Sequence, residues 1–487
     1  MELELKFALP TQNPDILEKQ LARTPFIGRR RAKREQLHNT YYDTPEHALK
    51  GQGMALRVRQ FGDAAQPHWV QTLKIGGAAN SALSRRGEWE EALPSNALDA
   101  SLLHDTPWAA WDPKWEIFNT LTPVFTTVFE RLSWVAELPQ GRVDIALDRG
   151  EVLMDGQRTP LCELEIELLQ GDPEAVFEAA DAIAQHLALL PAHISKAERA
   201  YRLAQGTVYA PLRAKPPALS EDMPFAQVAQ TVLRECFLQF TANLNSLQHS
   251  DAPEILHQAR IGWRRLRSML KLLQLQSESR GFPRWEALKP LLQGMTILRD
   301  LDVAATEVLP LYANAYQAGD IQRIAHWAFL EGNLQQARVA QLDAVRTLLA
   351  TPAVGRTLLH MTHWLETEAL QAPDNLSDGK SEPLRKWLKK RVAKLVATLD
   401  AMPVHSKDPL QQHAMRILCK RLRYSVESLR PLLPRKKAEH WHHHATRRQT
   451  QIGVERDRLQ ALQLAQQLHA AEGLVEFLRG AAFGASV

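Results

Sequence analysis

Cysteine is scarce in this chain, and long apolar runs are missing from it. Its 487 residues include three cysteines, Cys162, Cys236 and Cys419, which are far apart and form no Cys-x-x-Cys pair. An odd number of scattered thiols favours a reducing compartment over a disulfide framework. No stretch of about 20 uninterrupted apolar residues could span a bilayer, and no basic and then apolar leader opens the sequence. We therefore expect a cytoplasmic protein with no membrane partner.

The chain also lacks a large excess of charge of either sign. It has 59 Lys and Arg against 55 Asp and Glu, which gives a net charge of +4. A globally cationic nucleic-acid-binding protein is therefore not indicated, although charge that clusters locally still matters. A chain of this length is expected to form two or three domains, each with its own core.

The pattern of the sequence changes near residue 205. Before it, short segments alternate polar and apolar residues, as strands do, and a helical run follows at about 173–189. The stretch 206–224 is rich in proline and has no period, which indicates a linker. From 225 to 487 the apolar residues follow helical spacing. We predict an α+β protein with a strand-rich domain at 1–205 and an all-α domain at 225–487.

The first strand, ELELKF, places its charged residues on one face and its apolar residues on the other. Later strands do the same, and some supply mainly acids while others supply mainly bases. The charged positions are Glu2, Glu4, Lys6, Arg57, Arg59, Lys74, Arg86, Glu88, Glu90, Arg131, Asp144, Asp148, Glu163, Glu165 and Glu167. A solvated outer face is the usual meaning of such alternation.

The acids in CELEIEL point to another arrangement. Glu163, Glu165 and Glu167 stand at i, i+2 and i+4, where they repel one another unless a cation or base neutralises them. The strands are numerous enough to close into a barrel whose lumen collects both signs. Carboxylates are the ligands that Mg²⁺ and Mn²⁺ prefer, and guanidinium and ammonium groups bind phosphate oxygens. Such a lumen suits a short, highly charged phosphate chain.

The motifs of the first half form an ordered series. They are ELELK, LRVR, TLK, RGEWEEAL, ERLSW, ALDRGEV, ELEIEL and SKAERAYRL. As a set they resemble the CYTH superfamily, also called triphosphate tunnel metalloenzymes, over nearly all of 1–205. The resemblance implies an eight-stranded antiparallel barrel that forms a tunnel for triphosphate. It also implies metal-assisted hydrolysis with two ions of Mg²⁺ or Mn²⁺, which orient the phosphate and activate a water.

Carried over position by position, the resemblance implies a ligand set and a phosphate path. The implied metal ligands are Glu2, Glu4, Glu165 and Glu167, with Glu163 as a further candidate. The implied substrate-binding residues are Lys6, Arg57, Arg59, Lys74, Arg86, Arg131 and Lys196. Lys74, Glu2 and Glu4 are the candidate catalytic residues, with Lys74 placed to assist the leaving oxygen. Lys6 and Arg86 have an alternative role as ion-pair partners of neighbouring acids, and Asp148 is expected to serve a turn.

A basic motif occurs twice in the helical half. HQARIGWRRLR and HAMRILCKRLR each carry a histidine followed by bases three, seven and ten residues later. The repeated positions are His257, Arg260, Arg264 and Arg267 in the first copy and His413, Arg416, Lys420 and Arg423 in the second, with Lys271 extending the first. On a helix they fall within an arc of about 80°. One such stripe is usually a solvated face, but two without interleaved acids indicate a bound polyanion.

The polyanion is expected to lack bases, because few aromatic residues interleave with the stripes to stack on nucleobases. The pieces HxxRxxxRRLR, LRDLDV and KRLRYSVESL resemble the CHAD domain over about 225–487. The resemblance implies two pseudo-symmetric four-helix bundles around a basic groove that binds inorganic polyphosphate. The second copy departs from the family pattern at Arg456 and Asp457, which are therefore assigned no contact.

A run of histidines, HWHHHATRR at 440–448, invites a metal interpretation. Consecutive histidines on a helix cannot all face one ion, so we interpret the run as a surface segment. Protonation of these side chains at mildly acidic pH would strengthen anion binding nearby.

The leading hypothesis is an inorganic triphosphatase. It would hydrolyse tripolyphosphate to pyrophosphate and phosphate, while its helical domain binds inorganic polyphosphate. One alternative is another tunnel enzyme, a nucleoside or thiamine triphosphatase or a class IV adenylyl cyclase. A second alternative is a non-catalytic polyphosphate-binding or tethering protein. No nucleic-acid partner is expected.

Overall fold

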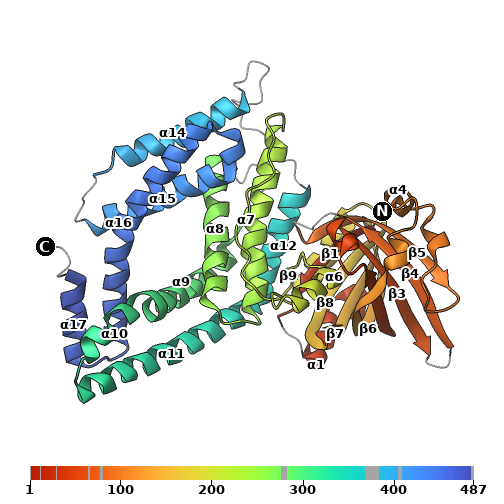
Figure 1. The fold of residues 1–487 in the computed structure, drawn as a ribbon, viewed down its shortest axis with the longest axis horizontal. Coiled ribbons are helices and arrows are strands. Elements are labelled where there is room, and N and C mark those ends of the chain that lie inside the picture. The colour runs from red at the N-terminus through yellow and green to blue at the C-terminus, as the bar shows by residue number, and fades with distance from the viewer. Residues whose placement is uncertain are drawn as a thin grey trace. The chain divides into compact units, whose positions relative to one another are not determined.

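The computed structural model of the chain describes residues 2–10, 13–28, 30–63, 66–76, 81–275, 282–367, 383–403 and 408–483. Their contacts divide the chain into two units. The barrel unit contains Met1–Ala210 and Ala350–Glu366, and the helical unit contains Pro211–Leu349 and Thr367–Val487. Figure 1 shows the strands gathered in the first unit and long helices in the second.

Eight antiparallel strands form a closed barrel, as the sequence predicts. They are β1 (Glu2–Ala8), β2 (Lys33–Asp43), β3 (Met54–Asp63), β4 (Gln66–Ile75), β5 (Leu83–Leu93), β6 (Thr122–Leu138), β7 (Gly141–Met154) and β8 (Gln157–Gly171). Their order is β5-β4-β3-β2-β6-β7-β8-β1, and pairing of β1 with β5 closes the ring. The short β9 (Leu190–Pro191) adds to β1.

The register of β1 brings the charged residues of three strands together. Glu4 pairs with Glu167 and Lys6 with Glu165 on β8, while Glu2 pairs with Arg86 on β5. Directly opposed residues of neighbouring strands point to the same side of a sheet, so the charged face of β1 continues across β8 and β5. In the closed barrel this face looks into the lumen.

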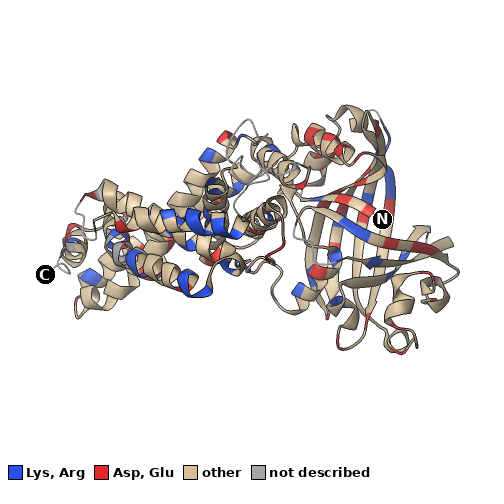
Figure 2. Ribbon diagram, turned by 90° about the horizontal axis from the view of Figure 1, so that it is seen from above, with Lys and Arg blue, Asp and Glu red and all other residues tan. Residues whose placement is uncertain are grey.

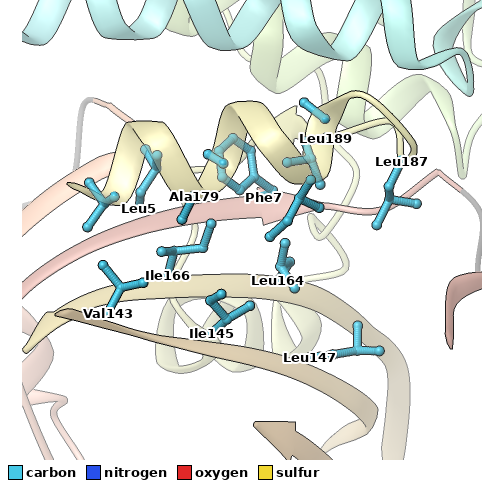
Figure 3. Packing of buried hydrophobic residues seen from close by; sticks show 14 of the residues in the cluster. Leu5, Phe7, Val143, Ile145, Leu147, Leu164, Ile166, Ala179, Leu187 and Leu189 are labelled. Carbon is cyan, nitrogen blue, oxygen red and sulfur yellow. The ribbon is translucent and has the colours of Figure 1, made fainter. Parts of the chain in front are cut away.

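The apolar face of β1 packs outside the lumen, against helix α5 (Glu174–Ala184). Leu5 and Phe7 lie in one core with residues of β7, β8 and α5, such as Ile145 and Ala179, and Figure 3 shows the helix lying across these strands. The helix forms because its apolar residues recur at helical spacing and are buried on that face. The solvated-face interpretation is therefore wrong for β1, because both of its faces are buried.

Smaller helices complete the barrel unit. They are α1 (Pro14–Leu21), α2 (Pro25–Gly28), α3 (Ala48–Gly51), α4 (Pro107–Trp111) and α6 (Lys196–Ala204). Between Ala204 and Phe225 the chain forms neither helix nor strand, as the high proline content predicts.

A helix from far along the chain, α12 (Pro352–Thr367), packs on α5. Arg356 and His360 both contact the Asp181 carboxylate, at 2.7 and 2.8 Å, and His363 lies 2.8 Å from Glu174. Sequence patterns assign every residue after 225 to the helical domain, because α12 has the same spacing as its neighbours. The structure instead groups 350–366 with the barrel.

The helical unit is built from long helices. They are α7 (Phe225–Leu247), α8 (Pro253–Leu272), α9 (Lys289–Val303), α10 (Pro310–Gln317), α11 (Ile321–Leu349), α14 (Leu384–Asp400), α15 (Pro409–Leu429), α16 (Arg435–Gln467) and α17 (Glu472–Phe483). One of its cores joins α9, α10 and α11 to α16 and α17, so the two sequence copies share a core. The expected pair of pseudo-symmetric four-helix bundles stays a prediction. Across the described residues, no helix has the length and apolar character needed to cross a membrane.

Candidate active site and anion-binding groove

The lumen of the barrel contains a cavity of about 470 Å³ whose wall is mostly charged. The acids on the wall are Glu2, Glu4, Glu88, Glu90, Asp144, Glu165 and Glu167, and the bases are Lys6, Arg57, Arg59, Lys74, Arg86, Arg131 and Lys196. The metal-ligand and substrate-binding residues that the CYTH resemblance implies all line this cavity, with one exception. Glu163 stays off the cavity wall and its side chain is 2% exposed.

Three carboxylates form an acidic corner of this cavity, which consists of Glu2, Glu88 and Glu167. Each offers an oxygen within 4.8 Å of the others. Lys74 on β4 neutralises part of the corner, because its ammonium lies 2.9 Å from Glu2 and 3.1 Å from Glu88. Among the residues that the structure describes, Glu167 forms no ion pair. Burial, together with the charge of Glu2, raises the pKa of Glu167 to about 7.

The acidic corner fits a hard divalent cation. All of its donors are carboxylate oxygens, the ligand type that Mg²⁺ and Mn²⁺ prefer. Three acids and one lysine leave an excess of negative charge, and a cation there would relieve the repulsion that raises the pKa of Glu167.

A second acidic group, Asp148, Glu163 and Glu165, is also close enough to share an ion, but it is already neutralised. The Lys196 ammonium lies 2.6 to 2.8 Å from all three carboxylates. Burial alone would raise the pKa of Glu165, but Lys196, Lys6 and Arg131 outweigh it and hold the pKa well below its usual range. Of the two groups, the structure therefore favours the acidic corner for metal.

Lys196 reaches this buried cluster from the first turn of α6. Ser195 caps the helix by accepting a hydrogen bond from the Glu198 amide, which sets where the helix begins and directs Lys196 into the lumen. The ammonium is buried, and the surrounding carboxylates outweigh that burial and raise the pKa of Lys196 above its ordinary value.

Several predicted residues turn out to be held by ion pairs. Lys6 lies 2.7 Å from Glu165, and Arg86 lies 3.4 Å from Glu4. Arg131 donates from Nε and Nη2 to the two oxygens of Asp148, both at 2.7 Å. The expectation that Asp148 serves a turn is wrong. The residue lies inside β7 and is fully buried.

Arg57 and Arg59 on β3 form a wall with free hydrogen-bonding capacity. The carboxylates of Glu88 and Glu90 are 3.9 Å from Arg57, too far for a hydrogen bond. Its buried Nε has no hydrogen-bond partner in the described part of the chain. Arg59 donates from Nε to Asn39 at 2.9 Å. Buried guanidinium donors without a partner are suited to an anion.

The cavity includes residues that the sequence analysis left without a role. Glu88 and Asp144 already stood on the charged faces of their strands, so alternation was the available signal. Tyr41 and Ser195 also line the cavity. A tyrosine within a strand has the pattern of a core residue, and a serine before a helix has the pattern of a helix cap. The sequence therefore did not indicate that these two residues line a cavity.

The two basic stripes of the helical unit line a single groove of about 800 Å³. Helices α8 and α15 pack against each other there, and all nine predicted residues, His257 to Lys271 and His413 to Arg423, are on its wall. Figure 2 shows Lys and Arg gathered over helices of this unit. Arg456 and Asp457, which were assigned no contact, line the groove as well.

Burial and the crowding of positive charge lower the pKa of two weaker bases in the groove. Burial and then Arg264 and Arg416 lower the pKa of Lys420 to about 6. Burial and then Arg299 lower the pKa of His257 to about 4. Both groups are therefore largely neutral at pH 7, because burial and the arginines of the groove disfavour further positive charge. An anion in the groove would reverse this.

The histidine run lies on α16 and its members have separate partners. His442 is 2.9 Å from Glu427 and His444 is 2.8 Å from Asp400. Within the described ranges, the groups of three side chains close enough to share an ion contain no histidine. This agrees with a surface segment.

Two domain families match successive parts of the chain. The CYTH domain family matches residues 1–201 and the CHAD domain family matches residues 231–466. An inorganic triphosphatase of Haemophilus influenzae is 31% identical over 207 residues, which cover 42% of this chain and 54% of that protein. The chain thus spans about half the length of this curated relative.

Solved structures resemble each half. The CHAD domain of Ricinus communis is 26% identical with a TM-score of 0.47, covering 56% of this chain and 91% of that one. A candidate adenylyl cyclase from Hippeastrum with a dominant triphosphatase activity is 22% identical with a TM-score of 0.32, covering 42% and 97%.

Proposed function

The chain is a CYTH domain, residues 1–201, fused to a CHAD domain, residues 231–466, and from this premise we propose that it is a metal-dependent inorganic triphosphatase. The substrate is inorganic tripolyphosphate, which is hydrolysed to pyrophosphate and phosphate. The similarity to the Haemophilus influenzae inorganic triphosphatase, at 31% identity over 207 residues, supports the same reaction class.

The observation that carries the proposal is that one cavity of about 470 Å³ holds both an acidic corner and arginines with unused donors. The acidic corner has three carboxylates within 4.8 Å of one another. Arg57, which comes within 3.9 Å of Glu88, and Arg59 have donors that are incompletely used. Tripolyphosphate complements both features when a divalent cation neutralises part of its charge. A cavity that served anion binding alone would not need the acidic corner.

The roles of the protein's own residues follow from this arrangement. Arg57, Arg59 and Arg131 hold phosphate oxygens and stabilise charge on the transferred group. Lys74 bridges the acidic corner and the phosphate path, where it assists the leaving oxygen. A divalent ion held by Glu2, Glu88 and Glu167 would act as a Lewis acid on the phosphate oxygens.

Glu4, Glu163 and Glu165 stay candidate ligands. Their ion pairs with Lys6, Arg86 and Lys196 make a supporting role more natural, in which they hold the bases of the tunnel in place. The expected number of ions, two, is to be counted by titration of Mn²⁺.

The helical unit is proposed to bind inorganic polyphosphate in its groove. The nine predicted bases and histidines line that groove together, and a chain of phosphates matches a stripe of bases along each of two helices. Binding there would hold long chains on the same protein that cleaves short ones.

The test compares turnover of tripolyphosphate, ATP and thiamine triphosphate by the purified chain in Mg²⁺ or Mn²⁺. We expect tripolyphosphate to be preferred, and Glu2→Gln to abolish phosphate release. Lys271→Gln, in the helical groove, is the matched control and should leave hydrolysis intact. Preference for a nucleotide or for thiamine triphosphate would replace the proposal with the other tunnel chemistries. Polyphosphate binding without any metal-dependent turnover would indicate a binding protein.

A further inference from the structure

Lys420 is unusual among the bases of the helical groove. Its side chain is half-buried on α15, and in the described part of the molecule it has neither an ion-pair nor a hydrogen-bond partner. Four guanidinium groups act on it instead, from Arg260 and Arg264 on α8, Arg416 on α15 and Arg456 on α16. The acid that faces it from α16, Asp457, is 3.7 Å from Arg416.

The amine is therefore held in its nucleophilic form. Burial, and then the nearby arginines, lower the pKa of Lys420 to about 6, so roughly nine-tenths of the amines are neutral at pH 7. An ordinary lysine is almost wholly protonated at that pH, and a protonated amine has no lone pair with which to attack. A lysine beside other cationic groups is a recognised form of activated nucleophile.

The same arginines provide phosphate recognition next to the amine. The guanidinium of Arg264 forms no ion pair or hydrogen bond within the described ranges, and Arg260 donates to the neutral hydroxyl of Thr296 at 2.6 Å. Guanidinium groups bind phosphoryl oxygens through paired, charge-assisted hydrogen bonds. A small molecule with a phosphoryl group attached to an electrophilic carbon would be delivered to Lys420 by its phosphate.

We propose that Lys420 is an acylation site for acyl phosphates, which the arginines of the same groove bind and whose carbonyl carbon Lys420 Nζ attacks. The lone pair of Lys420 Nζ forms a bond to the carbonyl carbon, and the bond between that carbon and the phosphate oxygen breaks. Inorganic phosphate leaves with the electron pair and remains against Arg264 and Arg260. The amine's surplus proton passes to water, and an amide is left on Lys420.

Acylation would change how the groove binds anions. An amide cannot take up a proton when a phosphate chain arrives, so one charge-assisted contact is lost. Such a contact is worth about tenfold in affinity. A bound polyphosphate chain would in turn protect Lys420, because it occupies the arginines and favours the protonated amine. Acyl phosphate supply and polyphosphate binding would thus oppose each other at one residue.

The experiment treats the full chain with acetyl phosphate at pH 7.5 and measures acetylation of each lysine by peptide mass spectrometry over time. Lys271, exposed in the same groove, is the matched internal control. We expect Lys420 to react at least tenfold faster than Lys271. The rate should saturate with acetyl phosphate, and inorganic polyphosphate should suppress it.

Two further arms separate nucleophilicity from phosphate recognition. Acetic anhydride, which has no phosphate, should label Lys420 without saturation. Arg264→Gln should slow the reaction with acetyl phosphate more than that with the anhydride, and Arg260→Gln repeats the test should the first variant fold poorly by circular dichroism. Equal rates at Lys420 and Lys271, or equal selectivity with both reagents, would overturn the proposal.

The inference depends on phosphate binding by the groove and not on hydrolysis in the barrel. Polyphosphate affinity, measured by calorimetry on the same sample, distinguishes the two. Selective acetylation of Lys420 without polyphosphate binding would remove that part of the proposed function and leave this inference standing. Polyphosphate binding without selective acetylation would overturn this inference and leave the proposed polyphosphate binding standing.

Discussion

The ammonium nitrogen of Lys196 lies 2.6 Å from a carboxylate oxygen of Glu163, and their side chains are only 7% and 2% exposed. An ion pair so removed from water depends on both partners, because either charge alone would be buried without compensation. The pair joins the first turn of α6 to β8, beside the apolar cluster in which Ala200 and Tyr201 of the same helix are buried.

Removal of Lys196 should therefore destabilise the barrel. Lys196→Met leaves Asp148, Glu163 and Glu165 with one cation fewer, and breaking a buried pair from one side costs about 3–5 kcal/mol. Urea unfolding of the full chain, followed by far-ultraviolet circular dichroism, measures the loss. The double variant Lys196→Met/Glu163→Gln should recover part of it. A single variant as stable as the parent would show that water reaches the cluster.

The acidic corner makes a separate prediction for Glu88. Glu88→Gln replaces one of three carboxylates, whose oxygens lie within 4.8 Å of one another, by a neutral amide, so the Mg²⁺ concentration for half-maximal tripolyphosphate hydrolysis should rise roughly tenfold or more. Glu90→Gln is the control, because Glu90 lies on the same strand and cavity wall but outside the corner. Similar Mg²⁺ concentrations for half-maximal hydrolysis in the two variants would show that Glu88 is not a metal ligand.

Glu88 also shows how far the sequence alone could lead. Alternation and family motifs predict a closed barrel, and they identify which residues face its lumen. They do not predict which acids meet across that lumen, because this depends on strand register and on side-chain reach. Glu4 and Glu167 are directly paired, yet Glu2 and Glu88 share the corner with Glu167.

In the helical half, the repeated stripes identify the groove, but not all of its wall. The stripe positions on α8 and α15 follow from helical spacing. Arg456 enters the groove from α16, whose pattern carries no matching stripe. The packing of α12 on α5 could not be predicted from the sequence either. An apolar helix face indicates that the helix is buried, but not which element it packs against.

The contact between α12 and the rest of the barrel unit can be tested at Gly355. A Cβ atom there would lie 2.6 Å from the backbone nitrogen of Leu189, and backbone cannot yield as a flexible side chain can. We expect Gly355→Val to lower the midpoint of thermal unfolding by several degrees, since even 1 kcal/mol shifts it by about 2–4 °C in proteins of 150–250 residues. Differential scanning calorimetry of the full chain gives the measurement.

Gly332 on α11 is the matched control for this substitution. A Cβ atom at Gly332 meets no atom within 4 Å, and alanine in a helix is favoured over glycine by about 0.5–1 kcal/mol. Gly332→Ala should therefore raise the midpoint slightly. An unchanged midpoint in Gly355→Val would mean that α12 does not pack closely on Leu189.

The last prediction concerns the pH dependence of polyphosphate binding. The pKa of Lys420 is about 6, and the negative charge of a bound chain must raise it. Between these two pKa values, binding takes up a proton. Affinity should therefore be constant below about pH 6 and fall as the pH rises above it, by at most tenfold per pH unit. Calorimetric titration with long polyphosphate between pH 6 and 8.5 measures the slope.

Lys420→Arg isolates the group responsible for this slope. Arginine keeps its charge throughout the range, so the variant should bind with nearly constant affinity and without proton uptake when titrated in buffers of different ionisation enthalpy. His257, whose pKa is about 4, takes up a proton in this window only to the extent that the bound chain raises its pKa into it. A slope that persists in Lys420→Arg would assign the proton to another group, such as His257 on α8.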